Sequence, residues 1–142
     1  MAYMSQEMKK ELAPAIKAVL KKYNVKGSIS VDNYSSLVVT LKEGALDFIG
    51  DANEYNKEYA DRRGERFYEV KDHYQVNTYY AAERAINKKI GLFFKELIAA
   101  MNGKGTKIAN HDNSDIMTDY FDVGWYVNVN VGKWDKPYQL VK

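Results

Sequence analysis

Residues 121–131, with the sequence FDVGWYVNVNV, have the strongest strand pattern in the chain. Apolar side chains occupy every second position, at Phe121, Val123, Trp125, Val127, Val129 and Val131. Successive residues of a strand point to opposite faces of the sheet, so one face of this strand belongs in a core. The other face, which carries Tyr126, Asn128 and Asn130, must meet water or a partner. The fold must therefore contain a sheet with one apolar face.

Two helices and a hairpin are predicted around this strand. The first helix starts at Ser5 as N-cap and runs to about Tyr23, and Pro14 either kinks it or lies in the first turn of its regular part. Alternating apolar residues predict a hairpin over 28–41 that turns at 32–35. A long helix is expected from Asn77 or Thr78 to Met101, closed by Asn102 and Gly103.

Residues 44–76 have the weakest pattern and are typical of a variable insert in a smaller domain. A short helix over 53–61 and an edge strand over 67–76 are expected there. The order of elements predicts an α+β fold in which one antiparallel sheet packs against two α-helices. We expect residues 1–142 to form a single domain, since a chain of this length buries enough surface to fold alone.

Composition excludes several classes of protein. The chain has no cysteine, so it can hold neither a disulfide nor a thiolate-bound zinc ion. Its N-terminal residues lack the apolar stretch of a signal peptide, and no apolar run approaches the roughly 18 residues that span a bilayer. We therefore expect a cytoplasmic protein without membrane contact. No cofactor is predicted, because phosphate-loop, dinucleotide and nucleophile-elbow motifs are absent.

Positive charge is concentrated in the two predicted helices, although the net charge of the chain is only +2. Residues 1–27 and residues 83–107 each contain six Lys or Arg and two Glu. On the long helix, Arg84, Lys88 and Lys95 are expected to lie on one stripe beside Gly91. This stripe would suit a phosphate backbone or an acidic protein, but ordinary solvent-facing helices have the same charge pattern.

A cluster of acidic residues precedes the final strand, in NHDNSDIMTDYFDVGWY at 110–126. A hard metal ion could be held by His111, Asp115, Asp119 and Asp122, because it needs several converging oxygen ligands. No known metal-binding spacing is present, however, and Asp, Asn and Ser are the usual residues of turns and helix N-caps. We therefore interpret Asp112–Asp122 as structural capping and expect no metal.

The C-terminal segment YVNVNVGKWDKPYQLVK is the second candidate binding surface. It combines polar strand residues with aromatic and basic ones, namely Tyr126, Asn128, Asn130, Lys133, Trp134, Lys136 and Tyr138. Aromatic side chains beside lysines can stack on bases or anchor a protein interface. The alternative is that Trp134 and Tyr138 only cover the end of the core.

The two ends of the chain resemble a family of small proteins and domains found in phages and other mobile elements. They are similar, more loosely, to a domain that accompanies large polyvalent phage and plasmid proteins. The resemblance covers about the first 43 and last 29 residues, and its main motifs are KKEL at 9–12, TDYF at 118–121 and GKWDKPY at 132–138. It implies a mobile-element setting but no particular reaction.

These observations predict a non-enzymatic accessory protein of a phage or mobile element that binds a host protein or a nucleic acid. The alternative is a metal-dependent phosphoesterase or nuclease that uses the aspartates of residues 112–122. The sequence leaves open whether the protein forms a homodimer. Binding through several phosphates would weaken steeply as salt concentration rises, which separates the nucleic-acid hypothesis from the others.

Overall fold

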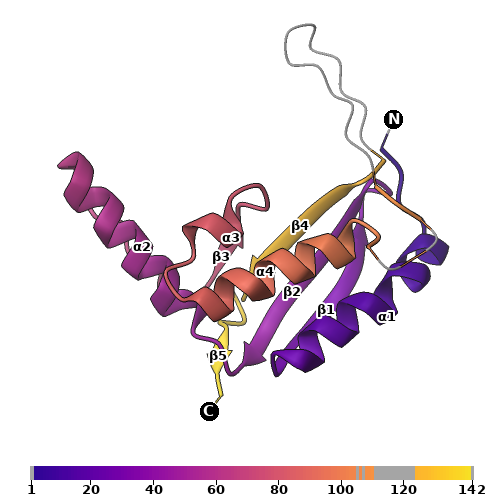
Figure 1. Ribbon diagram of the computed structural model, residues 1–142, viewed down its shortest axis with the longest axis horizontal. Coiled ribbons are helices and arrows are strands. Elements are labelled where there is room, and N and C mark those ends of the chain that lie inside the picture. The colour runs from indigo at the N-terminus through magenta and orange to yellow at the C-terminus, as the bar shows by residue number, and fades with distance from the viewer. Residues whose placement is uncertain (1, 105, 107, 111–123, 142) are drawn as a thin grey trace, which may run out of the picture.

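The computed structural model describes residues 2–104, 106, 108–110 and 124–141 (Figure 1). These residues form a small α+β domain with a mixed sheet. Its elements, in chain order, are α1 (Gln6–Lys22), β1 (Val25–Asp32), β2 (Ser36–Gly44), α2 (Phe48–Arg63), β3 (Tyr74–Val76), α3 (Ala81–Arg84), α4 (Lys88–Met101), β4 (Tyr126–Val131) and β5 (Gln139–Leu140). The predicted fold class is confirmed, but the described residues contain four helices instead of two.

The sheet has the strand order β1-β2-β4-β3, and β5 also pairs with β2. Strand β1 is antiparallel to β2, and β3 is antiparallel to β4. The central pair β2 and β4 is parallel, as is the short pair β2 and β5. The prediction of a wholly antiparallel sheet was therefore wrong. A long crossover that contains α2, α3 and α4 separates β2 from β4 in the chain, and such a crossover allows parallel pairing.

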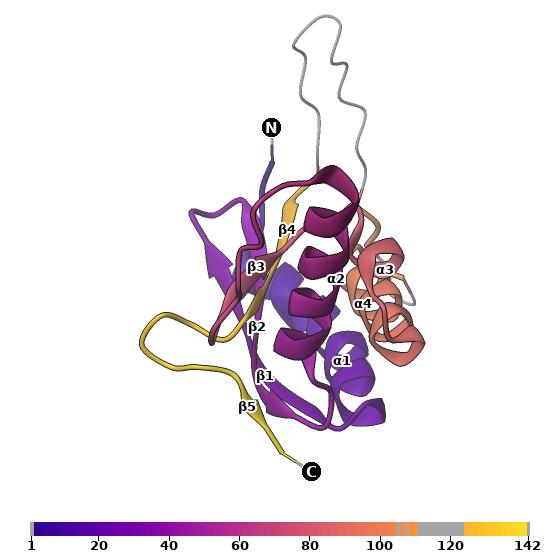
Figure 2. The same cartoon turned by 90° about the vertical axis from the view of Figure 1, so that its left-hand side faces the viewer.

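Helices α1 and α4 lie side by side on one face of the sheet, and none of the helices in the described residues covers the opposite face (Figures 1 and 2). The core fills the space between these two layers. On the sheet it contains Leu37, Val39 and Leu41 of β2 with Val129 and Val131 of β4, and on the helices it contains Leu12, Ile16, Phe93, Leu97 and Met101. The buried apolar residues of α1 and α4 thus face the sheet.

Strand β4 has the two faces that its sequence predicts. Trp125, Val129 and Val131 are buried and Val127 is partly buried, whereas Tyr126 is exposed. The indole Nε1 of Trp125 donates a hydrogen bond to the carbonyl of Met101 at 3.0 Å, so the strand is tied to the end of α4. Phe121 and Val123 lie outside the described residues.

The N-terminal half also follows its sequence closely. Ser5 caps α1 by accepting a hydrogen bond from the backbone N–H of Met8 at 3.1 Å. Pro14 lies within α1, which continues through it to Lys22. The β1–β2 hairpin turns at Asn33 and Tyr34, whose φ angles of 53° and 56° are those of the two-residue turn that matches the twist of paired strands.

Residues 44–76 differ from their prediction. Helix α2 is longer than the predicted helix over 53–61, because Asp47 caps its start and Gly64, at φ 65°, ends it. The predicted strand over 67–76 shrinks to β3, and residues 65–72 return along α2. The amide of Asn53 holds this return segment by bonding both the N–H and the carbonyl of Val70, at 2.6 and 2.8 Å. Helix α2 projects from the body of the domain (Figure 1).

The single long helix predicted over 77–101 was wrong. Helix α3 ends at Arg84, and Ala85 is extended with a ψ angle of 125°. Helix α4 starts at Lys88 with Asn87 as its N-cap, and the carboxylate of Asp51 on α2 accepts from the N–H groups of Ile86 and Asn87 at 3.3 and 2.7 Å. Because these contacts come from α2, the apolar periodicity of the segment could not reveal the break.

Candidate nucleic-acid interface

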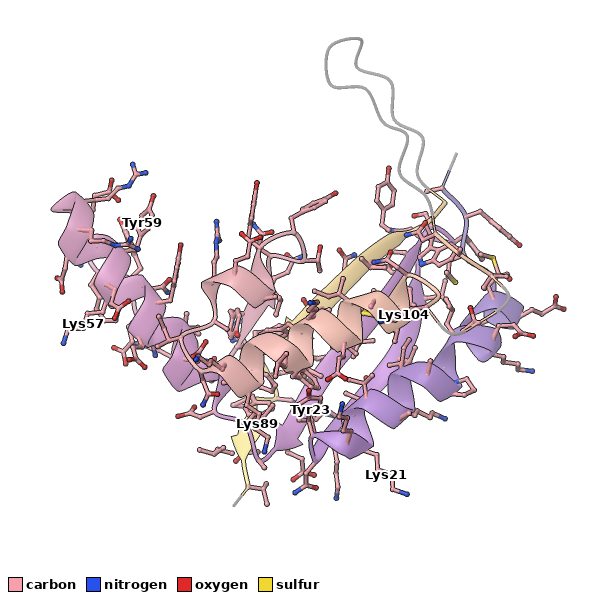
Figure 3. The ribbon with its side chains drawn as sticks, in the orientation of Figure 1. Lys21, Tyr23, Lys57, Tyr59, Lys89 and Lys104 are labelled. Atoms are coloured by element: carbon pink, nitrogen blue, oxygen red, sulfur yellow. The ribbon has the colours of Figure 1, made fainter. Side chains whose placement is uncertain are left out.

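The outer helical layer of the domain has a concentration of positive charge. Helix α1, helix α4 and Lys104 together contain nine lysines and three glutamates, a charge of +6 in a chain whose net charge is +2. We call these lysines the lysine layer: Lys9, Lys10, Lys17, Lys21, Lys22, Lys88, Lys89, Lys95 and Lys104. Figure 3 shows Lys89 near the first turn of α4 and Lys104 beyond its last. Such a concentration of one sign attracts polyanions.

One glutamate is engaged within this layer. Glu96 of α4 accepts a hydrogen bond from Lys22 of α1 at 2.6 Å and another from the hydroxyl of Tyr23. Its hydrogen bonds to Lys22 and Tyr23 lower the pKa of Glu96, and the hydrogen bond from Lys22 raises the pKa of that lysine. Both groups therefore stay charged at neutral pH, and Lys22 is engaged while the other lysines of the layer stay exposed or partly exposed.

Lys88 and Lys95 lie seven residues apart on α4, so they share one side of the helix as predicted. The expected groove beside Gly91 is absent, because α3 covers this glycine. A Cβ atom added to Gly91 would lie 3.0 Å from the carbonyl oxygen of Ala82. Arg84 belongs to α3, so the predicted stripe of Arg84, Lys88 and Lys95 on one helix was wrong.

Arg84 instead joins a row of aromatic rings. Its guanidinium carbon lies 5.3 Å from the ring centre of Tyr80 and 5.7 Å from that of Tyr55 on α2. Tyr55 stacks on Tyr59, with ring centres 6.1 Å apart and planes at 26°, and the guanidinium of Arg63 lies 5.0 Å from the ring of Tyr59. We call this row of Tyr80, Arg84, Tyr55, Tyr59 and Arg63 the tyrosine–arginine ladder. It extends from α3 along the projecting helix.

The charges of α2 are divided between two sides of the helix. Tyr55, Tyr59 and Arg63 repeat every four residues on the ladder side, whereas Glu54, Glu58 and Asp61 follow a separate stripe. None of the ion pairs formed among the described residues involves Arg63 or Arg84. Their guanidinium groups therefore rest on aromatic rings with no carboxylate partner, and they remain able to bind an anion.

A cleft of about 280 Å³ opens beside the inner end of the ladder. Tyr55 and Arg84 line it together with side chains that can form hydrogen bonds, among them Asn56, Tyr74 and Asn77. Burial raises the pKa of Tyr74, so its hydroxyl stays protonated and can donate. Burial also raises the pKa of Asp51 on the cleft wall, although its two backbone hydrogen bonds oppose that rise. The cleft thus combines one arginine and the carboxylate of Asp51 with several neutral polar groups.

The uncovered face of the sheet carries the predicted polar residues of β4. Asn130 pairs with Thr40 on one side and with Gln75 on the other, and Asn128 and Tyr126 pair with Val38 and Ser36. Most of these side chains are neutral and can form hydrogen bonds. The structure thus confirms that Tyr126, Asn128 and Asn130 share the face away from the helices, but it shows no charged group among them.

The turn that follows β4 presents the remaining C-terminal candidates. Lys133 and Lys136 close this turn with two backbone hydrogen bonds, at 2.8 and 3.2 Å, and Trp134 is 81% exposed near its tip. Trp134 therefore does not cover the core. The alternative interpretation, in which Trp134 only covers the end of the core, was wrong. Lys133 and Lys136 line a hollow with Lys42, but Glu43 and Asp135 also line it and offset much of the positive charge.

Tyr138 is part of the core, so its prediction as a surface binding residue was wrong. Only 8% of it is exposed, and its ring meets that of Phe48 edge to face with centres 5.3 Å apart. Its hydroxyl donates a hydrogen bond to the carbonyl of Leu46 at 2.8 Å. The residue anchors the C-terminal segment to the start of α2.

Tyr138→Phe is expected to lower the free energy of unfolding by about 0.5 to 1.5 kcal/mol, because the hydrogen bond from its hydroxyl to the Leu46 carbonyl is lost while that carbonyl keeps the N–H of Phe48. Urea denaturation would measure this loss. Tyr126→Phe is the matched control, since Tyr126 is 46% exposed and its hydroxyl can bond to water. Equal stability of the two variants would contradict the structural role of Tyr138.

His111, Asp112, Asp115, Asp119 and Asp122 lie outside the described residues, so their predicted capping role stays a prediction. Among the residues that the structure describes, no group of three His, Asp or Glu side chains could hold a metal ion. Within the same residues, no helix is long and apolar enough to cross a membrane.

The tyrosine–arginine ladder was missed by the sequence analysis, although part of its signal was available. Tyr55, Tyr59 and Arg63 are spaced by four residues, as are Tyr80 and Arg84, and residues at this spacing are neighbours on a helix. The prediction of a helix only over 53–61 left out Arg63. The contact between Arg84 and Tyr55 joins two distant segments, and no local pattern could show it.

No family model, curated protein or solved structure matches the chain. The resemblance to phage and mobile-element proteins therefore stays a prediction. The function must be inferred from the lysine layer, the ladder and the cleft.

Proposed function

We propose that the protein binds nucleic acid without catalysing a reaction, as an accessory protein of a phage or mobile element. The observation that carries this proposal is the lysine layer, because α1, α4 and Lys104 together carry nine lysines and three glutamates on one side of the domain. Phosphate contacts from lysine supply most of the affinity of non-specific nucleic-acid binding. The mobile-element setting rests on the resemblance of residues 1–43 and 114–142 alone.

The footprint is centred on α4, which lies between α1 on one side and α2 and α3 on the other (Figure 1). Lys88 and Lys95 face the α3 side of this helix, while Lys89 and Lys104 lie along the side nearer α1. A phosphate backbone laid over α4 can meet all four lysines. The uncovered sheet face is the weaker candidate, because Glu43 and Asp135 accompany its lysines.

Salt titration of the unaltered protein tests the proposal. If four lysines contact phosphates of a single strand, a plot of log affinity against log salt concentration should have a slope of about −3. Fluorescence anisotropy with a labelled oligonucleotide, between about 50 and 200 mM NaCl, measures this slope. Binding that does not depend on salt, or no binding at the lowest salt concentration, would contradict the proposal.

The alternative function, a metal-dependent phosphoesterase or nuclease, predicts a different outcome in the same mixture. The labelled oligonucleotide would be shortened in the presence of Mg²⁺ or Mn²⁺ and stay intact in EDTA. A non-catalytic binder leaves the oligonucleotide intact with either metal. Cleavage that disappears in Asp115→Ala and Asp119→Ala would replace the proposed function by this alternative.

A further inference from the structure

We propose that the tyrosine–arginine ladder and the cleft beside it hold unpaired bases, so that the protein binds single-stranded nucleic acid in preference to duplex. This inference rests on the proposed function, since the lysines of α4 would hold the phosphates of the same strand. It assigns a role to residues of α2 and α3 that phosphate binding alone does not need.

The ladder has the chemistry of a stacking platform. Tyr59 is 37% exposed and Tyr80 is 51% exposed, so ring edges and parts of their faces are open to a ligand. Tyr55, Tyr59, Arg62 and Arg63 also line a shallow hollow along α2. Aromatic rings and guanidinium planes are the groups on which proteins stack unpaired bases, because every base has a π-face.

The charges around the ladder favour an anionic ligand over a neutral one. Arg63 and Arg84 have no carboxylate partner among the described residues, and Glu54, Glu58 and Asp61 of α2 follow a different stripe. Asp51, which lines the cleft with Tyr55 and Arg84, accepts hydrogen bonds from the backbone N–H groups of Ile86 and Asn87. Phosphates beside stacked bases would therefore meet free arginines.

The cleft at the inner end of the ladder suits one base. Its volume of about 280 Å³ lies near the lower end of the range for small-ligand sites, roughly 300 to 1,000 Å³, and is too small for a duplex. Asn56 and Asn77 offer amide groups to the edge of a base, which is exposed only when the base is unpaired. Arg84 stands where this cleft meets the ladder.

The ladder and the lysines of α4 form one continuous path. Lys88 follows Arg84 by four residues, and α3 packs directly on α4 over Gly91. A strand whose phosphates lie on Lys95 and Lys88 would reach Arg84 next, and its bases would then meet Tyr55 and Tyr59. A duplex cannot use this path fully, because its bases are already stacked on one another and paired.

The experiment compares strands with and without bases. The probes are labelled dT and U oligomers of about 12 nucleotides, within the range that single-strand-binding folds cover, an abasic strand of equal length and a dT·dA duplex. Unaltered protein should bind the dT or U strand more tightly than the abasic strand and the duplex. Tyr59→Ala should weaken binding of that strand by roughly 5- to 150-fold, the range for loss of one stacked base. It should leave binding of the abasic strand unchanged.

Two variants at the same site serve as controls. Tyr59→Phe keeps the ring and should retain tight binding. Lys57→Ala removes a charge from the other side of α2, where Figure 3 shows Lys57 pointing away from Tyr59, and it should have little effect on the preference for bases. Circular dichroism would confirm that each variant is folded. If Tyr59→Ala is not, Arg63→Ala provides the same comparison at the exposed end of the ladder.

The outcomes separate this inference from the proposed function. Equal affinity of the unaltered protein for the abasic strand and for the dT and U strands would overturn the base-stacking inference and leave phosphate binding in place. Failure to bind any of the probes at low salt concentration would overturn both. Tighter binding of the duplex than of either single strand would also overturn the inference, because the ladder would then have no unpaired base to hold.

Discussion

Val129→Asp is expected to leave the protein unfolded at 25 °C. Val129 is fully buried in the middle of β4, between Val39 on β2 and Val76 on β3. A carboxylate at this position would lie in the core without a partner, at a cost of several kcal/mol. Because the whole free energy of unfolding of such a domain is about 5 to 15 kcal/mol, this cost removes much or all of it. Loss of the cooperative thermal transition and a red shift of Trp125 fluorescence would show the unfolding.

Asn128→Asp is the matched control for this prediction. Asn128 precedes Val129 on the same strand but lies on the face that no helix covers, where a charge can stay hydrated. We expect its free energy of unfolding to change by no more than about 0.5 kcal/mol, as for most surface substitutions. If instead Asn128→Asp unfolds the protein and Val129→Asp does not, the two faces of β4 have been exchanged.

The parts of the fold that were predicted correctly are those set by local pattern. The alternation in β4, the Ser5 cap of α1 and the turn at Asn33 and Tyr34 each depend on residues close together in the chain. The parallel pairing of β2 with β4 depends on how a crossover containing three helices returns to the sheet. No periodicity within either strand carries that information.

The break between α3 and α4, at the candidate site, is another feature that local sequence pattern could not predict. Apolar residues repeat with helical spacing through this segment, so its local pattern favours one helix. Asp51, more than 30 residues earlier in the chain, captures the N–H groups of Ile86 and Asn87 and holds the extended link. The side chain of Arg84 is thereby turned toward Tyr55 and Tyr80. The basic residues could be identified from the sequence, but their grouping with tyrosines depended on this distant contact.

Tyr138 illustrates how an aromatic residue in a polar segment can be misassigned. The lysines and the tryptophan around it suggest a surface, and Trp134 is indeed exposed. Gly132 has a φ angle of 69°, and an added Cβ atom there would approach the carbonyl of Asp72 and the N–H of Tyr138. This close approach returns the chain to β2, where β5 pairs with it and Tyr138 reaches Phe48. The burial of Tyr138 thus depends on the path of the chain after Gly132.

Removal of the lysines on α4 is expected to have the largest effect on nucleic-acid binding. The Lys88→Ala, Lys89→Ala, Lys95→Ala triple variant loses three phosphate contacts. For a single strand, the slope of log affinity against log salt concentration should therefore become less negative by about 2. Affinity near 50 mM salt should then fall by about 500-fold. The fold should persist, because alanine favours helix and because two of the lysines occupy the first turn of α4, where positive charge opposes the helix dipole.

The control for this variant is an equal change of charge on the other side of the molecule. Lys42→Ala, Lys133→Ala and Lys136→Ala together also remove three positive charges, but these lysines line the hollow beside the uncovered sheet face. If the footprint lies on α4, this second triple variant should retain most of the affinity and most of the salt slope. A larger loss in the second variant than in the first would move the interface to the C-terminal turn around Trp134. Similar losses in both would mean that binding follows the overall charge of the protein, without a footprint on either face.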